Sequence, residues 1–242
     1  AENYAGRDIK SVPEAVDVLM KGVLSRLQAI KPDILIEFRQ NYIGPAIRQY
    51  GNMFRASDCP GDMQNNRIRI ANLRLTSGTT AVHADMIEWN PNEKPEVAAR
   101  HILSALYGVV QYSVMLRDLP ESHFKVVRHW LDFSQKHRKT LLHSDFRPYH
   151  PEACFPILEA ESKAERIISA YQEGMVIKAG EADRDTYIIN ATGAEKVVVE
   201  LMGKPKKAEY YDTYGNLVAG SKLAKGLQSV VIPISGYVKL IY

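Results

Sequence analysis

The chain has 242 residues, of which 45% are hydrophobic and 24% are charged, as in an ordinary globular protein of one large or two smaller domains. Its net charge is only +3 and its basic residues are scattered among acidic ones, which argues against a nucleic-acid partner. Apolar runs such as residues 103–110 are too short for a membrane span, and no leader opens the chain. We therefore expect a soluble protein with no membrane partner, from either the cytoplasm or the periplasm.

The first 171 residues alternate helical and strand patterns. Ser11 to Glu14 has the form of a capping box, and apolar residues at helical spacing then predict a helix from Val12 to Ile30. Further helices are expected at 65–75, 95–107 and 120–142, and strands at 34–38, 52–55, 80–84 and 112–116. Because no hairpin signal intervenes, this alternation predicts a parallel sheet with right-handed crossovers.

The pattern changes near residue 172. Short β-branched or aromatic runs, separated by turn residues, occupy 175–179, 187–191, 196–201, 208–211, 229–234 and 237–242. The clearest turn lies within residues 211–216 (YDTYGN). We therefore expect an antiparallel all-β sandwich domain over 172–242. Two cysteines, Cys59 and Cys154, form no metal-ligand pattern and are expected to be free thiols.

Polar residues follow each strand of the predicted parallel sheet. They form four pairs: Glu37 and Arg39, Arg55 and Asp58, His83 and Asp85, Arg117 and Asp118. Ligands of α/β sheets and barrels bind at the carboxyl ends of strands, so these pairs mark where a binding site is built.

The segment 51–62 (GNMFRASDCPGD) is the densest of these clusters. Its Ser, Asp, Pro and Gly residues are typical of a simple turn followed by a helix N-cap. Arg55 at the end of a strand, together with the polar ends of the neighbouring strands, favours a functional site over a turn alone.

Three stretches carry a family resemblance: 36–40 (IEFRQ), 51–58 (GNMFRASD) and 82–86 (VHADM). They resemble the latter half of the catalytic barrel of glycoside hydrolase family 36, the α-galactosidases or melibiases, with Arg-x-Ser-Asp as the most specific part. Residues 151–161, followed by a β domain, are similar to the C-terminal sandwich of that family.

This resemblance implies a fold and an activity. Residues 1–171 are expected to form strands five to eight of a TIM (β/α)8 barrel, and 172–242 the sandwich. The implied function is part of a retaining α-galactosidase that hydrolyses terminal α-galactosides in oligosaccharides without a cofactor.

The resemblance also implies the site residues. Asp58 matches the general acid/base, while Glu37 and Arg55 match groups that bind sugar hydroxyls. A general acid for a glycosidic oxygen needs partial burial and a carboxylate about 5 Å away, and we expect Met53 and Phe54 to supply apolar surroundings. A structural ion pair between Glu37 and Arg55 is an equally good interpretation, and both can hold.

The neighbouring residues are expected to play lesser parts. His83 and Asp85 are assigned to substrate binding, with bracing of the pocket favoured over direct contact. Asp62 is expected to cap a helix rather than to tune Asp58. Trp89 and Tyr42 are expected to pack rather than to stack on a sugar.

The family's nucleophile is missing from the predicted site. It belongs to a Lys-x-Asp motif, and none precedes the helix at Val12. We expect this chain to be a fragment that is inactive alone. Because a half barrel exposes apolar strand edges, its expected partner is the remaining half barrel or a second copy of the chain.

Other functions stay open. The same barrel serves an α-glucosidase or an α-N-acetylgalactosaminidase, and the exact sugar is undetermined. A non-catalytic carbohydrate-binding fragment would need an aromatic platform, for which the candidates are Tyr187, Tyr210, Tyr211 and Tyr214. A metal-dependent hydrolase using Asp58, His83 and Asp85 is disfavoured, because no zinc spacing occurs.

Overall fold

The N-terminal half of the molecule is built on a four-stranded parallel sheet. The computed structural model describes residues 6, 8–39, 44–180 and 184–242. The sheet has the order β1 (Glu37–Arg39), β2 (Met53–Arg55), β3 (Ala81–Ile87) and β4 (Val109–Tyr112), and every pair is parallel. The predicted parallel sheet is therefore confirmed, although the fourth strand forms at 109–112 and not at 112–116.

Helices alternate with these strands as expected. They are α1 (Val12–Ile30), α2 (Met63–Thr76), α3 (Pro95–Ala105), α4 (Glu121–Lys136) and α5 (Arg138–His143), with short 3-10 turns η2 (Pro45–Gln49), η3 (Leu116–Asp118) and η4 (Pro151–Ala153). The single helix expected over 120–142 is wrong, because His137 leaves helical geometry and separates α4 from α5. Its Nδ1 lies 2.8 Å from a Glu165 carboxylate oxygen, so the break lets His137 reach the β-rich region.

The C-terminal half consists of two β-sheets. The larger has the order β12-β11-β14-β9-β7-β6-β5 and the smaller β13-β10-β8. Their strands are β5 (Asp145–Tyr149), β6 (Ile157–Glu161), β7 (Glu165–Ala170), β8 (Val176–Ala179), β9 (Asp185–Asn190), β10 (Lys196–Leu201), β11 (Lys207–Tyr211), β12 (Leu217–Ser221), β13 (Gly226–Val231) and β14 (Tyr237–Ile241).

This region is not purely antiparallel. The pairs β7–β9 and β10–β8 are parallel. The chain passes from β7 in the large sheet to β8 in the small one and back to β9, so strands two apart in sequence run in the same direction. The expectation of an all-antiparallel domain over 172–242 is wrong at β10–β8, and β9 also pairs in parallel with β7, which precedes that range.

The β-rich region begins earlier than the sequence pattern suggested. Its first strand starts at Asp145, so the boundary expected at 171/172 falls between β7 and β8, inside the region. The sequence of β5, DFRPY, carries charges and Pro148, which obscure its strand pattern. Proline is tolerated there because β5 is an edge strand of the large sheet.

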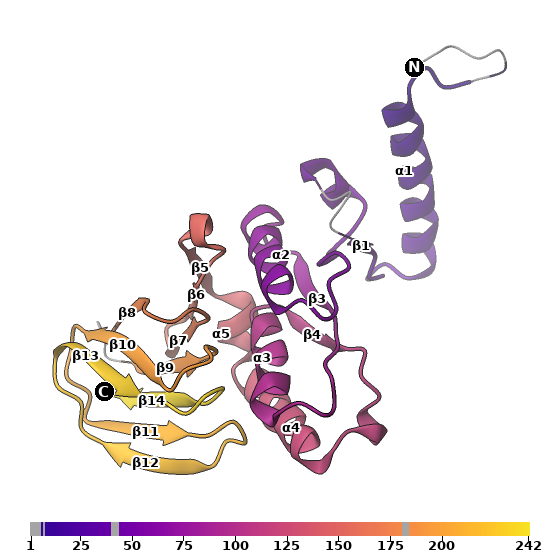
Figure 1. The fold of residues 1–242 in the computed structure, drawn as a ribbon. Helices are drawn as coiled ribbons and strands as arrows, with labels where there is room; N and C mark the ends of the chain where they lie inside the picture. The colour runs from indigo at the N-terminus through magenta and orange to yellow at the C-terminus, as the bar shows by residue number, and fades with distance from the viewer. Residues whose placement is uncertain (1–5, 7, 40–43, 181–183) are drawn as a thin grey trace.

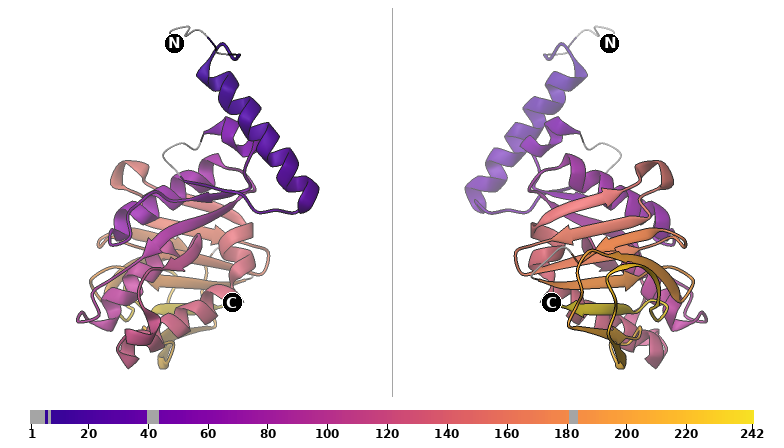
Figure 2. Two further views of the ribbon diagram at one scale, coloured as in Figure 1. Left: turned by 90° about the vertical axis from the view of Figure 1, so that its right-hand side faces the viewer. Right: turned by 90° about the vertical axis from the view of Figure 1, so that its left-hand side faces the viewer.

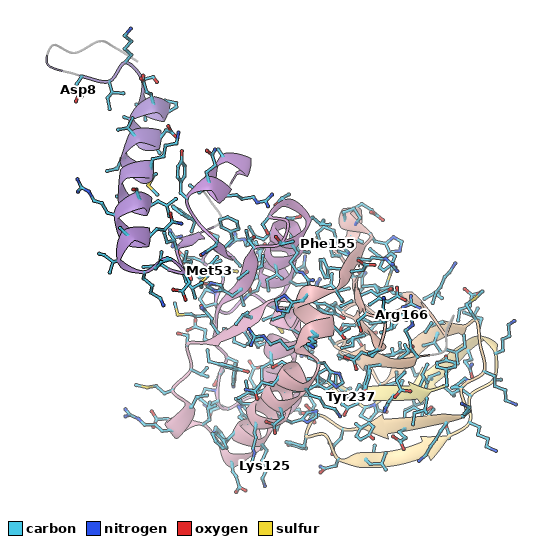
Figure 3. All side chains as sticks on the ribbon, turned by 180° about the vertical axis from the view of Figure 1, so that it is seen from behind. Asp8, Met53, Lys125, Phe155, Arg166 and Tyr237 are labelled. Carbon is cyan, nitrogen blue, oxygen red and sulfur yellow. The ribbon has the colours of Figure 1, made fainter. Side chains whose placement is uncertain are left out.

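Two hydrophobic cores hold the layers together. One joins the parallel sheet, the helices and the large sheet through residues such as Phe54, Ile70, Trp130 and Tyr237. The other fills the space between the two β-sheets. Helices α2, α3 and α4 lie between the parallel sheet and the β-rich region (Figure 1), and Tyr237 lies at the junction with α4 (Figure 3). The first of these cores therefore spans both halves of the molecule.

Helix α1 stands apart from this core. Ser11 caps it as predicted, accepting a hydrogen bond from the Glu14 amide at 3.3 Å. None of its residues is buried, and it projects from the body of the molecule (Figures 1 and 2). Within the described residues, no helix is both long enough and apolar enough to cross a membrane.

Tyr107 fixes the helical layer to the large sheet. Its hydroxyl is buried within hydrogen-bonding distance of Leu158 O (2.9 Å), Ile167 O (3.2 Å) and Ser169 Oγ (3.0 Å). Tyr107→Phe removes the hydroxyl that joins these three groups, so we expect urea denaturation to show a loss of roughly 1–3 kcal/mol.

Tyr112→Phe is the matched control for this prediction. Among the described residues the Tyr112 hydroxyl has no hydrogen-bond partner, so its loss should change stability by less than about 0.5 kcal/mol. Equal losses in the two variants would contradict the role assigned to Tyr107.

Candidate functional site

The register of the parallel sheet gathers the predicted site residues. Arg39, Arg55 and His83 are direct neighbours across β1, β2 and β3. Neighbouring residues in register point to the same face of a sheet. Phe54 points to the other face, where it is fully buried in the helix-side core. The alternation of strand residues thus separates a polar face from the core.

Arg55 connects two carboxylates. Its Nη1 donates to Asp85 Oδ1 at 2.8 Å, and its Nε lies 3.3 Å from Glu37 Oε1. The expected ion pair between Glu37 and Arg55 is therefore present, and Asp85 extends it. The side chain of Arg55 is 16% exposed and that of Asp85 only 4%, so this charged group is largely withdrawn from water.

Asp85 also holds the loop after β2 in place. Its Oδ2 accepts a hydrogen bond from the Cys59 backbone amide, and its own backbone exchanges two bonds of 3.2 Å with the Asn66 side chain. A buried carboxylate held this way anchors the loop that carries Asp58. The sequence offered no signal for the part played by Asn66, which is buried in α2.

His83 lies beside Glu37. Its Nε2 is 2.8 Å from Glu37 Oε2, and the imidazole is buried. Burial lowers the pKa of His83 below its usual value, against the opposing effect of the Glu37 carboxylate. We therefore expect a neutral imidazole at pH 7 that orients Glu37 without adding a charge.

Asp58 is the exposed carboxylate of the cluster. Arg39 Nη1 donates to its Oδ2 at 2.7 Å, and Arg69 Nη1 donates to its backbone carbonyl at 3.1 Å. Its side chain is 68% exposed, so the burial expected of a general acid is not supplied by the described residues. The expectation that Phe54 forms its apolar surroundings is wrong, because Phe54 packs on the opposite face of the sheet.

Arg39 is the residue whose importance sequence reasoning missed. It stands two positions after Glu37 in the same strand, which places both side chains on one face. That spacing was visible in the sequence, and it would have suggested a basic partner for Asp58.

The remaining residues considered at the strand ends lie outside this cluster. Asp62 is the N-cap of α2, as predicted, and its carboxylate accepts the Asn65 amide at 2.9 Å. That hydrogen bond lowers the pKa of Asp62. Arg117 and Asp118 lie in η3 and are exposed, with 3.6 Å between Arg117 Nε and Asp118 Oδ1. They contribute no contact to Glu37, Arg55 or Asp85.

The structure describes only one of the two aromatic residues in question, Trp89 and Tyr42. Trp89 is 8% exposed and donates from Nε1 to His123 Nδ1 at 3.0 Å, so it packs as expected. Tyr42 lies outside the described residues.

The arrangement contains anions and cations but no metal cage. Over residues 8–39, 44–180 and 184–242, no three His, Cys, Asp or Glu side chains converge as metal ligands. Cys59 and Cys154 are free, as predicted, and burial raises the pKa of Cys59 to about 11, which makes it a poor nucleophile. The groups that the cluster presents are the carboxylates and guanidinium groups described above.

Comparison with known proteins supports the fold. No protein-family profile and no curated protein sequence matches the chain. Its structure is similar to the galactosidase domain of the alpha-galactosidase-sucrose kinase AgaSK, with a TM-score of 0.56 and 15% sequence identity. The match covers 97% of this chain and 33% of the other, so this chain spans about a third of that protein's length. The protein described here thus has a galactosidase-like fold, a parallel α/β layer joined to a β-rich region.

Proposed function

We propose that this chain forms part of a retaining α-galactosidase, with Asp58 as the general acid/base and the four parallel strands as half of a (β/α)8 barrel. The observation that carries the proposal is the position of Asp58. It is an exposed carboxylate directly after β2, beside the Glu37, Arg55 and Asp85 network. The galactosidase-like fold supports the same assignment.

In this proposal Asp58 protonates the glycosidic oxygen as the bond to the leaving group breaks. It then removes a proton from the water that releases the sugar. Arg39 must give up its bond to Oδ2 for the carboxyl group to reach the substrate. Glu37 and Arg55 face the same side and are assigned to the sugar hydroxyls, which both donate and accept hydrogen bonds.

A retaining mechanism also needs a nucleophile about 5 Å from the acid/base. Asp85 is unsuited to this role, because it is buried and bound to Arg55 and the Cys59 amide. Glu37 is occupied by Arg55 and His83. We therefore assign the nucleophile to a segment outside this chain, and propose that the chain alone has no meaningful turnover.

The exposed face of α1 fits the same proposal. Val12, Leu19 and Ile30 are 62%, 63% and 84% exposed, and no residue of the helix is buried. Exposed apolar rows of this length mark an interaction surface. We propose that the remaining half of the barrel, or a second copy of the chain, covers it.

The test is an activity assay by complementation. An aryl α-galactoside is incubated with this chain alone, and then with a second polypeptide that carries the preceding strands of a galactosidase barrel. Activity is expected only in the mixture, and with a poor leaving group such as phenol Asp58→Asn should lower it by roughly 10²–10⁴-fold. Turnover by the chain alone, or a mixture indifferent to Asp58, would refute the assignment.

The same assay separates the alternative sugars. Aryl α-glucoside and aryl α-N-acetylgalactosaminide are substituted for the galactoside in the active mixture. Preference for either would move the function to an α-glucosidase or an α-N-acetylgalactosaminidase while keeping Asp58 in its role.

A further inference from the structure

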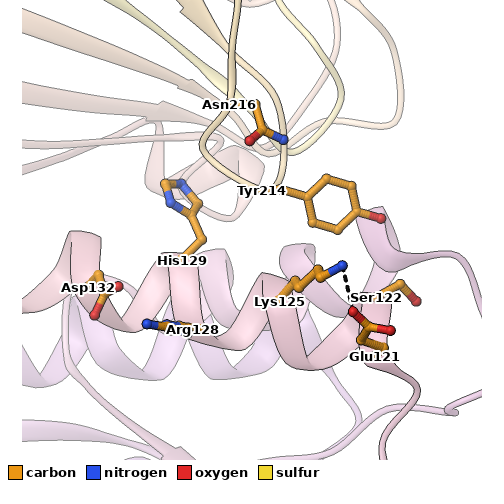
Figure 4. Close-up of a pocket in the computed structure, with 8 residues that line it drawn as sticks. All are labelled: Glu121, Ser122, Lys125, Arg128, His129, Asp132, Tyr214 and Asn216. Atoms are coloured by element: carbon orange, nitrogen blue, oxygen red, sulfur yellow. Dashed lines mark ion pairs between the residues drawn. The ribbon is translucent and has the colours of Figure 1, made fainter.

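A cavity lies away from the carboxyl ends of the parallel strands. It has a volume of about 740 Å³ and opens between α4 and the turn that joins β11 to β12 (Figure 4). This volume is within the range of small-molecule sites. Six of its lining residues carry the argument: Lys125, Arg128, His129, Asp132, Tyr214 and Asn216. None of them belongs to the Asp58 cluster.

The turn wall of the cavity is held rigid by Asp212. Its carboxylate accepts hydrogen bonds from the backbone amides of Tyr214 (2.9 Å) and Asn216 (2.8 Å), and from the Asn216 side-chain amide at 3.0 Å. The backbone of the turn and the Asn216 side chain are thus placed before any ligand arrives, and Tyr214 is partly buried against the helix-side core. Preorganisation of this kind lowers the entropic cost of binding.

The helix wall is equally constrained. His129 stacks on Tyr237, with 6.1 Å between ring centroids and 3° between ring planes. Gly215 approaches the imidazole so closely that a Cβ would collide with it, and its φ of +81° also favours glycine. Both walls of the cavity are therefore fixed by the fold.

The charges of the lining cancel. Lys125 pairs with Glu121 at 2.7 Å, while Arg128 and Asp132 are of opposite sign. Burial lowers the pKa of His129, which keeps it neutral near pH 7. A cavity balanced in this way attracts neither a phosphate nor a cation strongly.

The lining matches a polyhydroxylated ligand instead. Tyr214 presents a ring across the cavity from α4 (Figure 4), and sugars carry C–H faces that pack on such rings. The guanidinium group of Arg128 is a hydrogen-bond donor and the carboxylate of Asp132 is an acceptor. The Asn216 amide oxygen is a further acceptor, with no partner among the described residues. Sugar hydroxyls need donors and acceptors side by side.

We propose that this cavity is a non-catalytic binding site for a neutral saccharide, stacked on Tyr214 and hydrogen-bonded by Arg128 and Asp132. The site is independent of the catalytic proposal, since it uses none of the same residues.

The test titrates the 242-residue chain with raffinose and follows binding by NMR. Tyr214→Ala should weaken binding by at least about tenfold, while Tyr214→Phe, which keeps the ring, should stay within about threefold. Asp132→Asn and Arg128→Gln, at exposed positions that do not threaten folding, should each weaken it severalfold. Phe124→Ala is the matched control, because Phe124 is an exposed aromatic residue on the same helix outside the cavity lining.

Asp58→Asn separates this inference from the catalytic one, since it should leave raffinose binding unchanged even if the chain proves to be no glycosidase. Four results would overturn the inference: no binding of raffinose, equal binding by Tyr214→Ala and wild type, loss of binding in Asp58→Asn, or displacement of raffinose by inorganic phosphate.

Discussion

Asp58→Asn is expected to lower kcat/KM of the complemented enzyme for an unactivated α-galactoside such as raffinose by roughly 10²–10⁴-fold, the usual contribution of general acid–base catalysis. The amide cannot donate the proton that the departing oxygen requires. Dinitrophenolate departs from the sugar without protonation. The kcat/KM for a dinitrophenyl α-galactoside should therefore fall far less. Steady-state kinetics on the two substrates measure the difference.

The matched control is Asp62→Asn, four residues further along. Asparagine serves as an N-cap about as well as aspartate, so this variant should keep both α2 and the activity. If Asp58→Asn slowed both substrates equally, or if Asp62→Asn were as damaging, Asp58 would not be the acid/base.

Asp85→Ala should be among the most destabilising single changes in the parallel layer, costing roughly 3 kcal/mol in urea denaturation. It removes the buried partner of Arg55 and leaves the Cys59 amide without an acceptor. The loop that carries Asp58 loses its anchor at the same time. Activity of the complemented enzyme should therefore fall together with stability.

Asp118→Ala is the control for this prediction. Its carboxylate is paired with Arg117 at 3.6 Å on the exposed surface, so its loss should cost less than about 0.5 kcal/mol. A double variant, Asp85→Ala with Arg55→Met, should recover part of the loss, because no buried charge is then left without its partner. Additive losses would mean that the pair does not act as a unit.

Several elements were predictable because their cause is local. The cap at Ser11, the cap at Asp62 and the turn at 212–216 each depend on a side chain that bonds a nearby amide. The alternation of helix and strand likewise predicted the parallel sheet.

Other features depend on contacts between distant residues and left no local signal. The break at His137 coincides with a contact to Glu165, 28 residues away, which no local pattern indicates. Strand β12 is exposed throughout, so it has no alternation of apolar residues, and only its pairing with β11 defines it.

The sequence predicted which residues form the candidate site, but not how they are buried or hydrogen-bonded. The pattern singled out Glu37, Arg55, His83 and Asp85, but only Arg55 ends its strand, because Glu37 begins β1 and both His83 and Asp85 lie within β3. The division into a buried Asp85 and an exposed Asp58 did not follow from the pattern, because it depends on how the loop after β2 folds back onto β3.

The absence of buried residues in α1 makes it a separate unit of cooperativity. Its opening need not disrupt either core, so in the isolated chain its amide protons should exchange with solvent independently of global unfolding. A hydrogen bond from the Tyr50 hydroxyl to Asp17 ties α1 to the body of the molecule, but no buried apolar residue supports it, and the intrinsic propensity of a helix is marginal in water. Exchange protection of α1 is therefore a direct gauge of whether its apolar row has found a partner.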